Sequence, residues 1–436
     1  MTQYSLLKTI TVLIILCIPA LFTACSEDYP EDILLFTNVT VWDGTDGAPA
    51  QNSALVTHNG KVLKIIDMND PDFPEEAEAI DLDGRYIIPG LINAHGHVGM
   101  ARGLRTGPEI HSEENVIDQL KLYARYGITT VVSLGEEPDD AFAVRDRGNF
   151  SENGMARLFL AGPVLNPSTP EEATKAVNDL VQKNPDWSKI RVDDGLGTRE
   201  KMSRETYAAI IEASHNHNVP LAAHIVALED AKGVVEEGAD LVAHSVRDSE
   251  VDTELISLMR NHDICITPTL TREVSVFIYA DRPGFFDDSF FLDEADPEVI
   301  EQLQQPEVQQ SFTGRAADFY SEALSVAKEN MMALHNAGVR VAMGTDSGPP
   351  ARFQGYFEHL EMEMMQNAGM SPADILTSAT RYAAECMRID EELGTLKEGK
   401  WADFMVVDKN PFEDIRNLRS IYDVYIGAKR VNRGDN

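Results

Sequence analysis

The sequence predicts an α/β protein in which a (β/α)8 barrel is accompanied by a small β-sandwich built from both chain ends. Eight β-rich runs alternate with amphipathic helical segments through the middle of the chain, as parallel barrels require. Short strand-like runs precede and follow this region, and neither set holds enough apolar sequence for a core of its own. The length of 436 residues is sufficient for a large barrel with an accessory module.

The composition indicates a folded globular protein and argues against some classes of partner. A hydrophobic content of 43% is normal for a globular chain. The formal net charge of −35 is spread along the sequence and argues against nucleic acid or an anionic membrane surface as a partner. A small-molecule substrate remains the expected partner, and the sequence is compatible with a homo-oligomer.

Residues 1–24 predict a lipoprotein signal peptide. Lys8 precedes the uncharged run TITVLIILCIPALFTA, which is short for a membrane span and has the length of a signal-peptide core. The run ends in LFTAC, which resembles the bacterial lipobox, so Cys25 is expected to carry lipid and residues 25–31 to form a tether. An ordinary N-terminal anchor with an incidental cysteine is the alternative. Since Ser26 resembles an outer-membrane sorting position, we expect a membrane-anchored protein of the cell envelope, at the periplasmic face or the cell surface.

Two cysteines remain after the lipidated one. Cys265 lies in an apolar strand context and Cys386 in a helical one, whereas Cys17 would leave with the signal peptide. The two could pair in an oxidising compartment, but we expect buried free thiols.

The sandwich is predicted from residues 32–84 and 391–436. ILLFTNVTVWDG and ALVTHNGKVLKIIDM read as strands near the N-terminus, and the HNG between two β-rich stretches is a hairpin signal. ADFMVVDKN and DVYIGAKRVN read as strands near the C-terminus.

The barrel is predicted from residues 85–390. Its strands are expected within residues 84–95, 127–135, 156–163, 187–194, 220–226, 239–246, 263–270 and 340–348. Segments such as SRETYAAIIEASHNHN between them show apolar residues at helical spacing. An open doubly wound sheet is the alternative, but no Gly-rich nucleotide loop follows the first strand. Residues 271–299, rich in aromatic and acidic side chains, are expected to form a lid over the barrel mouth.

Potential metal ligands stand at the expected carboxyl ends of these strands, where barrels place functional side chains. His95 and His97 are two residues apart on an extended segment and therefore face the same side. The other strand ends supply Lys189, His224, His244 and Asp346. Neutral imidazoles and a carboxylate are ligands for Zn²⁺ or a similar divalent ion. A lysine can join them only as a carbamate, which is able to bridge two ions.

This set of residues resembles the amidohydrolase superfamily, and the resemblance extends over nearly the whole mature chain. It includes HxH after PGLI, a lysine on strand four, single histidines on strands five and six, and the C-terminal GTLKEGKWADFMVVDKNPFEDI. SKIRVDDG, AHSVRD and TPTLTREVS are similar to the branch that contains imidazolonepropionase-like and prolidase-like proteins. Asn93 is a departure, because many relatives carry Asp in PGLID.

The resemblance implies a centre for one or two divalent ions, most simply Zn²⁺. It places the first ion on His95, His97 and Asp346 and the second on His224 and His244, with carbamylated Lys189 as the bridge. Each of these residues has an alternative, purely structural role: a histidine can be a hydrogen-bonded core residue, and Asp346 can cap the following helix. Lys189 could instead pair with Asp193 or Asp194 and leave a one-metal site.

The reaction that the resemblance implies is hydrolysis of an amide or peptide bond by a metal-activated hydroxide. Asp346 would take the proton and pass it to the leaving amine. The candidate substrate-binding residues are Arg191, Arg247, Arg272 and Tyr279. Guanidinium groups at the mouth suggest a substrate carboxylate, as in a dipeptide or an N-acyl amino acid. Salt bridges to Asp193, Asp194 or Asp248 are the alternative use of these arginines.

Two other kinds of function stay open at this point. A cyclic amide, a lactone or an organophosphate could be hydrolysed on the same metal site, because fold and metal do not fix the substrate. A surface lipoprotein that binds ligands without catalysis, or an acidic scaffold, would not need all six metal-ligating positions.

Overall fold

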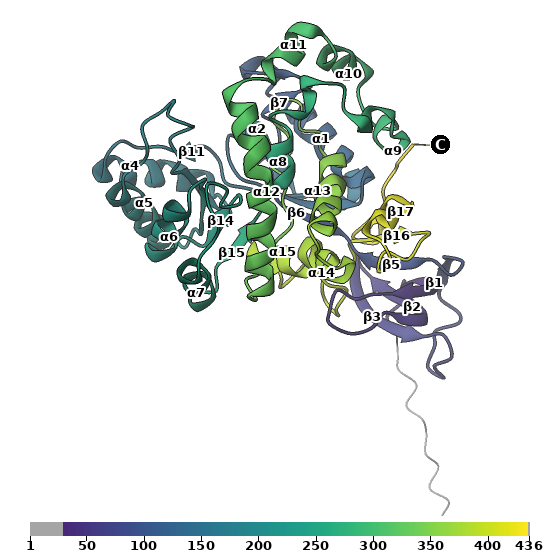
Figure 1. The fold of residues 1–436 in the computed structure, drawn as a ribbon. Coiled ribbons are helices and arrows are strands. Elements are labelled where there is room, and N and C mark those ends of the chain that lie inside the picture. Colours follow the sequence, from purple (N-terminus) through teal and green to yellow (C-terminus); the bar gives the residue numbers. More distant parts are fainter. Residues whose placement is uncertain (1–28, 435–436) are drawn as a thin grey trace, which may run out of the picture.

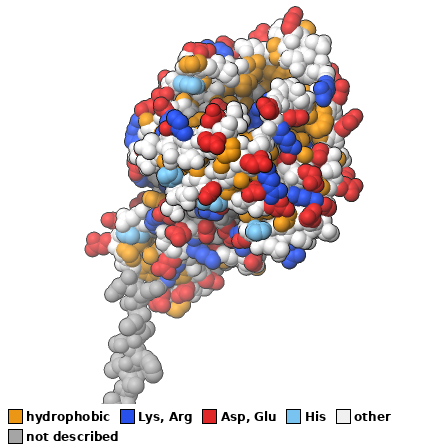
Figure 2. Space-filling model, turned by 90° about the vertical axis from the view of Figure 1, so that its left-hand side faces the viewer, with side chains coloured by type: hydrophobic (Ala, Val, Ile, Leu, Met, Phe, Trp, Pro, Cys, Tyr) orange, Lys and Arg blue, Asp and Glu red, His pale blue; other side chains and the backbone are white. Residues whose placement is uncertain are grey.

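The computed structural model describes residues 29–434 (Figure 1). The predicted signal peptide of residues 1–24, Cys25 and most of the tether lie outside the described residues. Within residues 29–434, no helix combines the length and the apolar character that crossing a membrane requires. Figure 2 shows carboxylate side chains scattered over the displayed face and mixed with Lys and Arg, in keeping with a net charge that is spread along the chain.

Strands from both chain ends form one mixed sheet. Its order is β18-β17-β16-β5-β1-β2-β3, and β4 pairs with β1. The bounds are β1 (Leu34–Val41), β2 (Ala50–His58), β3 (Lys61–Asp67), β4 (Glu78–Asp81), β5 (Tyr86–Pro89), β16 (Phe404–Val407), β17 (Ile421–Ile426) and β18 (Lys429–Arg430). The two ends meet where β5 pairs with β16 in antiparallel register. The predicted hairpin joins β2 and β3, and Asn59 and Gly60 at its turn both have positive φ, as type I′ turns require.

The centre of the chain contains two sheets of parallel strands. One comprises β6 (Leu91–Gly96), β9 (Ile128–Ser133) and β10 (Arg157–Leu160), paired in the order β10-β9-β6. The other runs β11 (Val164–Leu165), β12 (Ser188–Arg191), β13 (Leu221–His224), β14 (Leu241–Ala243) and β15 (Cys265–Thr267). The strands therefore follow the predicted order along the chain.

The predicted closed ring of eight strands is found only in part. Residues 340–348, the expected eighth strand, make single bridges from Val341 to Ile266 and from Ser347 to Gly96. The ladder is interrupted because Asp346 adopts positive φ, so that its N–H and that of Thr345 both donate to the His95 carbonyl. Among the described residues, paired strands consequently do not continue around a full circle, although this segment connects the two parallel sheets.

Helices follow most of the parallel strands, and Figure 1 shows α4 to α7 next to β11, β14 and β15, with α12 and α13 close to β6. The main ones are α1 (Glu113–Arg125), α2 (Asp139–Arg147), α4 (Pro170–Leu180), α5 (Arg204–Asn216), α6 (Leu228–Glu236), α7 (Thr253–Asn261), α12 (Arg315–Asn336), α13 (Tyr356–Asn367), α14 (Pro372–Thr377) and α15 (Ala383–Cys386). Their starts agree with the sequence: the side chains of Ser112, Ser203 and Ser371 each accept a hydrogen bond from a first-turn N–H.

The segment after β15 folds into short helices: α8 (Leu270–Val274), α9 (Ser289–Leu292), α10 (Pro297–Leu303) and α11 (Pro306–Ser311). Aromatic side chains hold it against the rest of the protein. Phe291 packs edge-on against Phe353 of the loop before α13 and against Tyr356, the first residue of α13, with ring centroids 4.8 and 5.0 Å apart. The Tyr126 hydroxyl donates to the carbonyl of Phe290 at 3.1 Å. These contacts attach the segment to the end of α1 and to the start of α13.

Cys265 and Cys386 form a disulfide, with Cα atoms 5.8 Å apart. The expectation of two free thiols is therefore wrong. The cysteines are 121 positions apart in the sequence, and only the packing of α15 against the start of β15 brings them together. No local pattern in the sequence carries that information.

Loss of this disulfide is expected to destabilise the protein. Because the bond closes a loop of 121 residues, it restricts the unfolded chain and contributes typically about 2–4 kcal/mol. We expect the double variant Cys265→Ser, Cys386→Ser to lose about that much free energy of unfolding in denaturant titrations. In protein that begins at Ser26, thiol titration under denaturing, non-reducing conditions should find no free thiol; two thiols per chain would contradict the assignment.

Candidate metal centre

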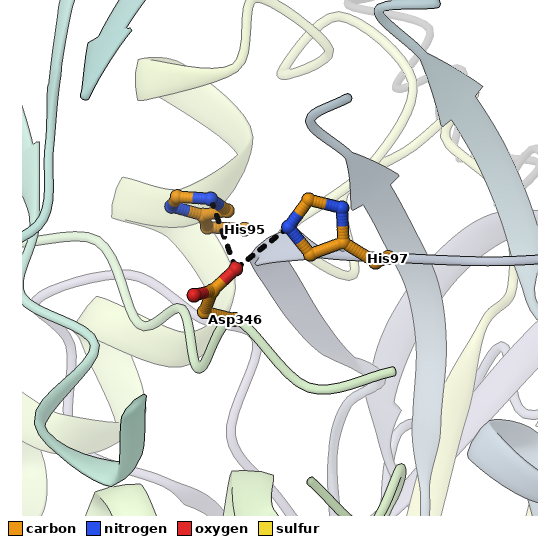
Figure 3. A group of neighbouring side chains, drawn as sticks. All are labelled: His95, His97 and Asp346. Carbon is orange, nitrogen blue, oxygen red and sulfur yellow. Dashed lines mark hydrogen bonds and ion pairs between the residues drawn. The ribbon is translucent and has the colours of Figure 1, made fainter. Parts of the chain in front are cut away.

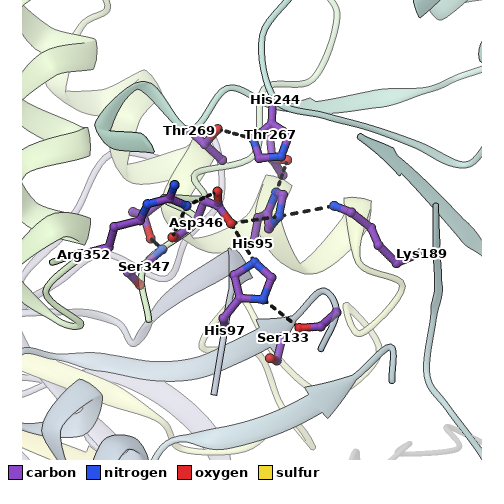
Figure 4. Close-up of polar contacts among 12 residues, drawn as sticks. His95, His97, Ser133, Lys189, His244, Thr267, Thr269, Asp346, Ser347 and Arg352 are labelled. Carbon is purple, nitrogen blue, oxygen red and sulfur yellow. Dashed lines mark hydrogen bonds and ion pairs between the residues drawn. The ribbon is translucent and has the colours of Figure 1, made fainter. Parts of the chain in front are cut away.

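All six predicted metal ligands line one cavity of 240 Å³ at the carboxyl ends of the parallel strands. They are His95, His97, Lys189, His224, His244 and Asp346. Figure 4 labels five of them, all except His224. The six come from five places in the fold. His95 and His97 come from β6 and the residue after it, Lys189 from β12, His224 from β13, His244 from the residue after β14, and Asp346 from the segment that follows α12. The cavity is therefore assembled from both parallel sheets and from the segment that connects them.

Three of these side chains form a compact group (Figure 3). One carboxylate oxygen of Asp346, Oδ1, lies 2.6 Å from Nε2 of His97 and 3.7 Å from Nε2 of His95. The possible ligand atoms of the three residues all lie within 4.8 Å of one another. Two imidazole nitrogens and a carboxylate oxygen are a usual donor set for a divalent ion.

The hydrogen bonds around the histidines orient their rings. Nδ1 of His97 lies 2.8 Å from the carbonyl oxygen of Gly135, which can only accept, so this nitrogen carries the proton. Nδ1 of His244 lies 2.6 Å from Oγ1 of Thr269, and Nδ1 of His95 lies 3.3 Å from Oγ1 of Thr267. Partners of this kind on the second nitrogen are typical of metal-bound histidines.

The contact between His97 and Asp346 tests whether a cation fits. Since Nδ1 of His97 already donates to a carbonyl, a neutral ring faces the carboxylate with the lone pair of Nε2, only 2.6 Å from Oδ1. Two acceptors at this distance require a shared cation or an extra proton between them. The arrangement fits two ligands of one metal ion.

The other half of the cavity holds the remaining predicted ligands. The His244 ring lies between those of His95 and His224, with centroid distances of 4.6 and 4.2 Å. Nζ of Lys189 lies 3.3 Å from Nε2 of His95. Asp193, the alternative partner of Lys189, contacts Nε2 of His224 at 3.2 Å instead. Lys189 therefore faces the histidines.

Burial sets the protonation states that metal ligands need. It lowers the pKa values of His95 and His244 well below the ordinary value of an imidazole and that of His224 to about 3, so all three rings are neutral at pH 7. Burial also lowers the pKa of Lys189 to about 7. Burial alone would raise the pKa of Asp346, but the Arg352 guanidinium and the His97 ring hold it well below the usual range.

Unusual backbone conformations coincide with the site. Asp346, His244 and Thr269 have φ values of 58°, 73° and 52°. Left-handed conformations of such residues cost on the order of 1–3 kcal/mol each and persist mainly at functional sites. Gly348 permits a related close approach, because a Cβ there would lie 2.1 Å from the carbonyl oxygen of His97.

The predicted substrate-binding residues divide into two pairs. Arg191 and Arg272 line the cavity with the histidines. Arg247 does not: it is buried, with Nε 3.1 Å from Oε1 of Glu273 and Nη1 donating to the carbonyl of Ser245. Tyr279 is also buried outside the cavity, and its hydroxyl donates to the carbonyl of Ala351.

Two important residues were not found by sequence reasoning. Arg352 lines the cavity, contacts Oδ2 of Asp346 through Nη1, and donates from Nε to Oγ of Ser275 at 3.0 Å. The signal available in the sequence was its position six residues after Asp346, in the loop that follows the expected eighth strand. The second residue that was missed is Glu358 on α13.

Glu358 explains the departure at Asn93. Its Oε1 accepts hydrogen bonds from Nδ2 of Asn93 at 2.6 Å, from Oγ1 of Thr345 at 2.7 Å and from Oγ of Ser347 at 2.6 Å. Thr345 and Ser347 flank Asp346, and Oδ1 of Asn93 accepts from the N–H of His95 at 3.0 Å. An amide at position 93 can donate to this buried carboxylate, whereas an ionised Asp would repel it. Glu358 and Asn93 therefore connect the two segments that carry the compact group.

Comparisons with known proteins also identify amidohydrolases as relatives of this chain. The model of the amidohydrolase family matches residues 86–431. Ochratoxinase from Aspergillus niger is 24% identical over 338 residues, which cover 75% of this chain and 61% of that protein. The chain thus spans about three fifths of the length of this curated relative.

Solved structures share the fold at low sequence identity. A Xaa-Pro dipeptidase with bound methionine in its active site aligns with a TM-score of 0.72 and 22% identity, over 91% of this chain and 99% of that one. A putative prolidase from Bifidobacterium longum aligns with a TM-score of 0.74 and 23% identity, over 92% and 95%.

Proposed function

Because this chain belongs to the amidohydrolase family, we propose that it is a metal-dependent hydrolase that cleaves the C–N bond of amides or peptides. The observation that carries the proposal is the convergence of His95, His97 and Asp346, with ligand atoms within 4.8 Å of one another, in a cavity that also holds three further potential ligands. The neutral His95 ring and the ionised Asp346 carboxylate are in the states that bind divalent ions.

The donor set favours Zn²⁺, in one or two copies. His95, His97 and Asp346 would hold the first ion. His224 and His244, which line the same cavity, would hold the second. Lys189 would serve both ions as a carbamate: its amine lies beside His95, and a pKa of about 7 leaves a neutral fraction able to add CO₂ at physiological pH. A bound divalent ion supplies a Lewis acid that polarises the substrate carbonyl and lowers the pKa of water.

The protein's own groups position the substrate and move the proton. Asp346 accepts a proton from the attacking water and transfers it to the leaving nitrogen, because an ionised carboxylate stands next to the ligand histidines. Arg191 and Arg272 line the same cavity and bind the carboxylate of the substrate, with Arg352 close to Asp346 as a third cation.

These cations favour dipeptides or N-acyl amino acids as substrates. Each carries a carboxylate at a fixed distance from the bond to be cleaved, which a guanidinium can bind with two parallel hydrogen bonds. The similarity to a Xaa-Pro dipeptidase and to ochratoxinase supports this substrate class.

We further propose that the enzyme is lipid-anchored through Cys25 in the cell envelope. The uncharged run before LFTAC supports this placement. The disulfide between Cys265 and Cys386 also supports it, since disulfides persist mainly in oxidising compartments.

The proposal is tested with protein that begins at Ser26, supplied with Zn²⁺ and bicarbonate. It is incubated with a library of dipeptides and N-acyl amino acids, and the released amino acids are quantified. We expect release from a subset of the library, and its loss when a chelator is added. Protein that holds metal but releases nothing from any member would overturn the proposal.

A further inference from the structure

A second cavity, of 160 Å³, adjoins the metal cavity. Pro349 and Arg352 line both cavities, so the two adjoin at these residues. The second cavity lies between α1, the short helices α9 and α10, the loop of residues 348–355 and the start of α13. None of its other lining residues has a part in the proposed hydrolysis.

Most of its wall is apolar and held in place. Leu122, Phe291, Val299, Phe353 and Tyr356 contribute side chains. Phe291 is buried and packs edge-on against Phe353 and Tyr356, with ring centroids 4.8 and 5.0 Å apart. Rings arranged in this way offer faces and edges to a further ring, an arrangement that aromatic groups prefer over stacking face to face.

The acidic residues at the rim are already engaged, which argues against a cationic occupant. Both carboxylate oxygens of Glu294 accept from Nε of Arg125 at 2.8 Å. Oδ1 of Asp296 accepts from the N–H of Glu298 at 2.9 Å and caps α10. A neutral apolar group therefore matches the cavity better than an ammonium group.

Two glutamines connect the cavity wall to the metal site. Nε2 of Gln354 donates to the carbonyl of His97 at 2.8 Å, and to Oε1 of Gln119 at 3.1 Å. Gln119 donates in turn to the carbonyl of Ala101 at 2.6 Å. The wall is thus fixed directly to the strand that carries two ligand histidines, which sets the distance between an occupant of the cavity and the reacting bond.

We propose that this second cavity is a specificity subsite that takes one aromatic ring of the substrate. The inference rests on the proposed hydrolysis at the neighbouring metal centre. A volume of 160 Å³ is sufficient, because an apolar cavity of about 150 Å³ in another protein binds benzene. The preferred substrate therefore combines a carboxylate, bound by the arginines of the metal cavity, with a ring next to the cleaved bond.

A substitution that fills the second cavity tests the inference through the kcat/KM values of matched substrates. Two matched substrate pairs are used: N-acetyl-phenylalanine with N-acetyl-alanine, and N-phenylacetyl-alanine with N-acetyl-alanine. In the wild type, kcat/KM should be at least tenfold higher for the ring-bearing member of one pair. Ala295→Leu, which places a larger side chain in the cavity wall, should lower that value at least tenfold and change the N-acetyl-alanine value less than twofold. Leu292→Ala on the same segment, at a side chain exposed to solvent, is the control that should change neither.

A binding measurement separates this inference from the proposed function. Calorimetry with 3-phenylpropanoate and butanoate should show at least tenfold tighter binding of the phenyl acid by the wild type, and loss of the difference in Ala295→Leu. The inference of a ring subsite would be overturned by equal affinities of the wild type for the two acids. It would also be overturned if Ala295→Leu lowered kcat/KM equally for both substrates of a pair. Ring-selective binding without any hydrolysis would instead remove the proposed function and leave the subsite.

Discussion

Asp346→Asn is expected to lower the rate of amide hydrolysis by roughly 10²–10⁴-fold, the range that a positioned general acid–base group contributes. Asparagine keeps the shape of the side chain but cannot accept the proton of the attacking water. It also weakens the site for the first ion, because the oxygen 2.6 Å from Nε2 of His97 loses its charge. Steady-state kinetics on the best substrate of the library measure the effect.

The matched control is Asp230→Asn. Asp230 is also a buried carboxylate, but it lies on α6 and pairs with Lys201, outside the metal cavity. We expect its turnover within about twofold of the wild type. A circular-dichroism spectrum and a metal analysis of both variants show whether the fold and the ion are retained. If Asp346→Asn keeps more than a tenth of the wild-type rate, the proton-transfer role is wrong.

Lys189→Ala is expected to lower turnover at least about 100-fold. Mutations of residues that support metal ligands lower activity by up to about this factor. The variant removes the carbamate that is proposed to bridge the two ions. Since it leaves an empty space beside His95, a small carboxylate such as acetate or propanoate should restore part of the activity in a concentration-dependent way. Initial rates at increasing propanoate concentration give the measurement.

Lys201→Ala is the control for this experiment, because Lys201 is a half-exposed lysine that pairs with Asp230. Its activity should be near that of the wild type and should not respond to propanoate. A wild-type rate in Lys189→Ala would exclude any role in the site. A loss that no carboxylate reverses would indicate that Lys189 acts as an ammonium group beside a single ion.

The positions of the six candidate ligands around one cavity could be predicted because they depend on local rules. Alternation along a strand places His95 and His97 on one face. In parallel sheets the carboxyl ends of strands lie at one edge, and the structure has His224 as the last residue of β13 and His244 directly after β14. These rules need no knowledge of distances across the fold, and the cavity unites all six residues.

Features that depend on contacts between distant segments could not be predicted. The disulfide was missed because nothing near Cys265 or Cys386 shows that β15 and α15 meet. Arg247 and Arg352 both follow strand segments, but Arg247 turns inward to the buried Glu273, whereas Arg352 turns to Asp346. The incomplete ring of strands is also of this kind: β10 and β11 lie in separate sheets, and the segment around Asp346, which has positive φ, makes only isolated bridges.

The central claim is that these residues form a metal centre that hydrolyses amides. Its most direct test is a titration of chelator-treated protein, beginning at Ser26, with Zn²⁺ in the presence of bicarbonate while hydrolysis of the best library substrate is followed. We expect no activity before addition, and a rise that saturates at one or two ions per chain. Activity that is already present in the metal-free protein and does not change with added Zn²⁺ would contradict the claim.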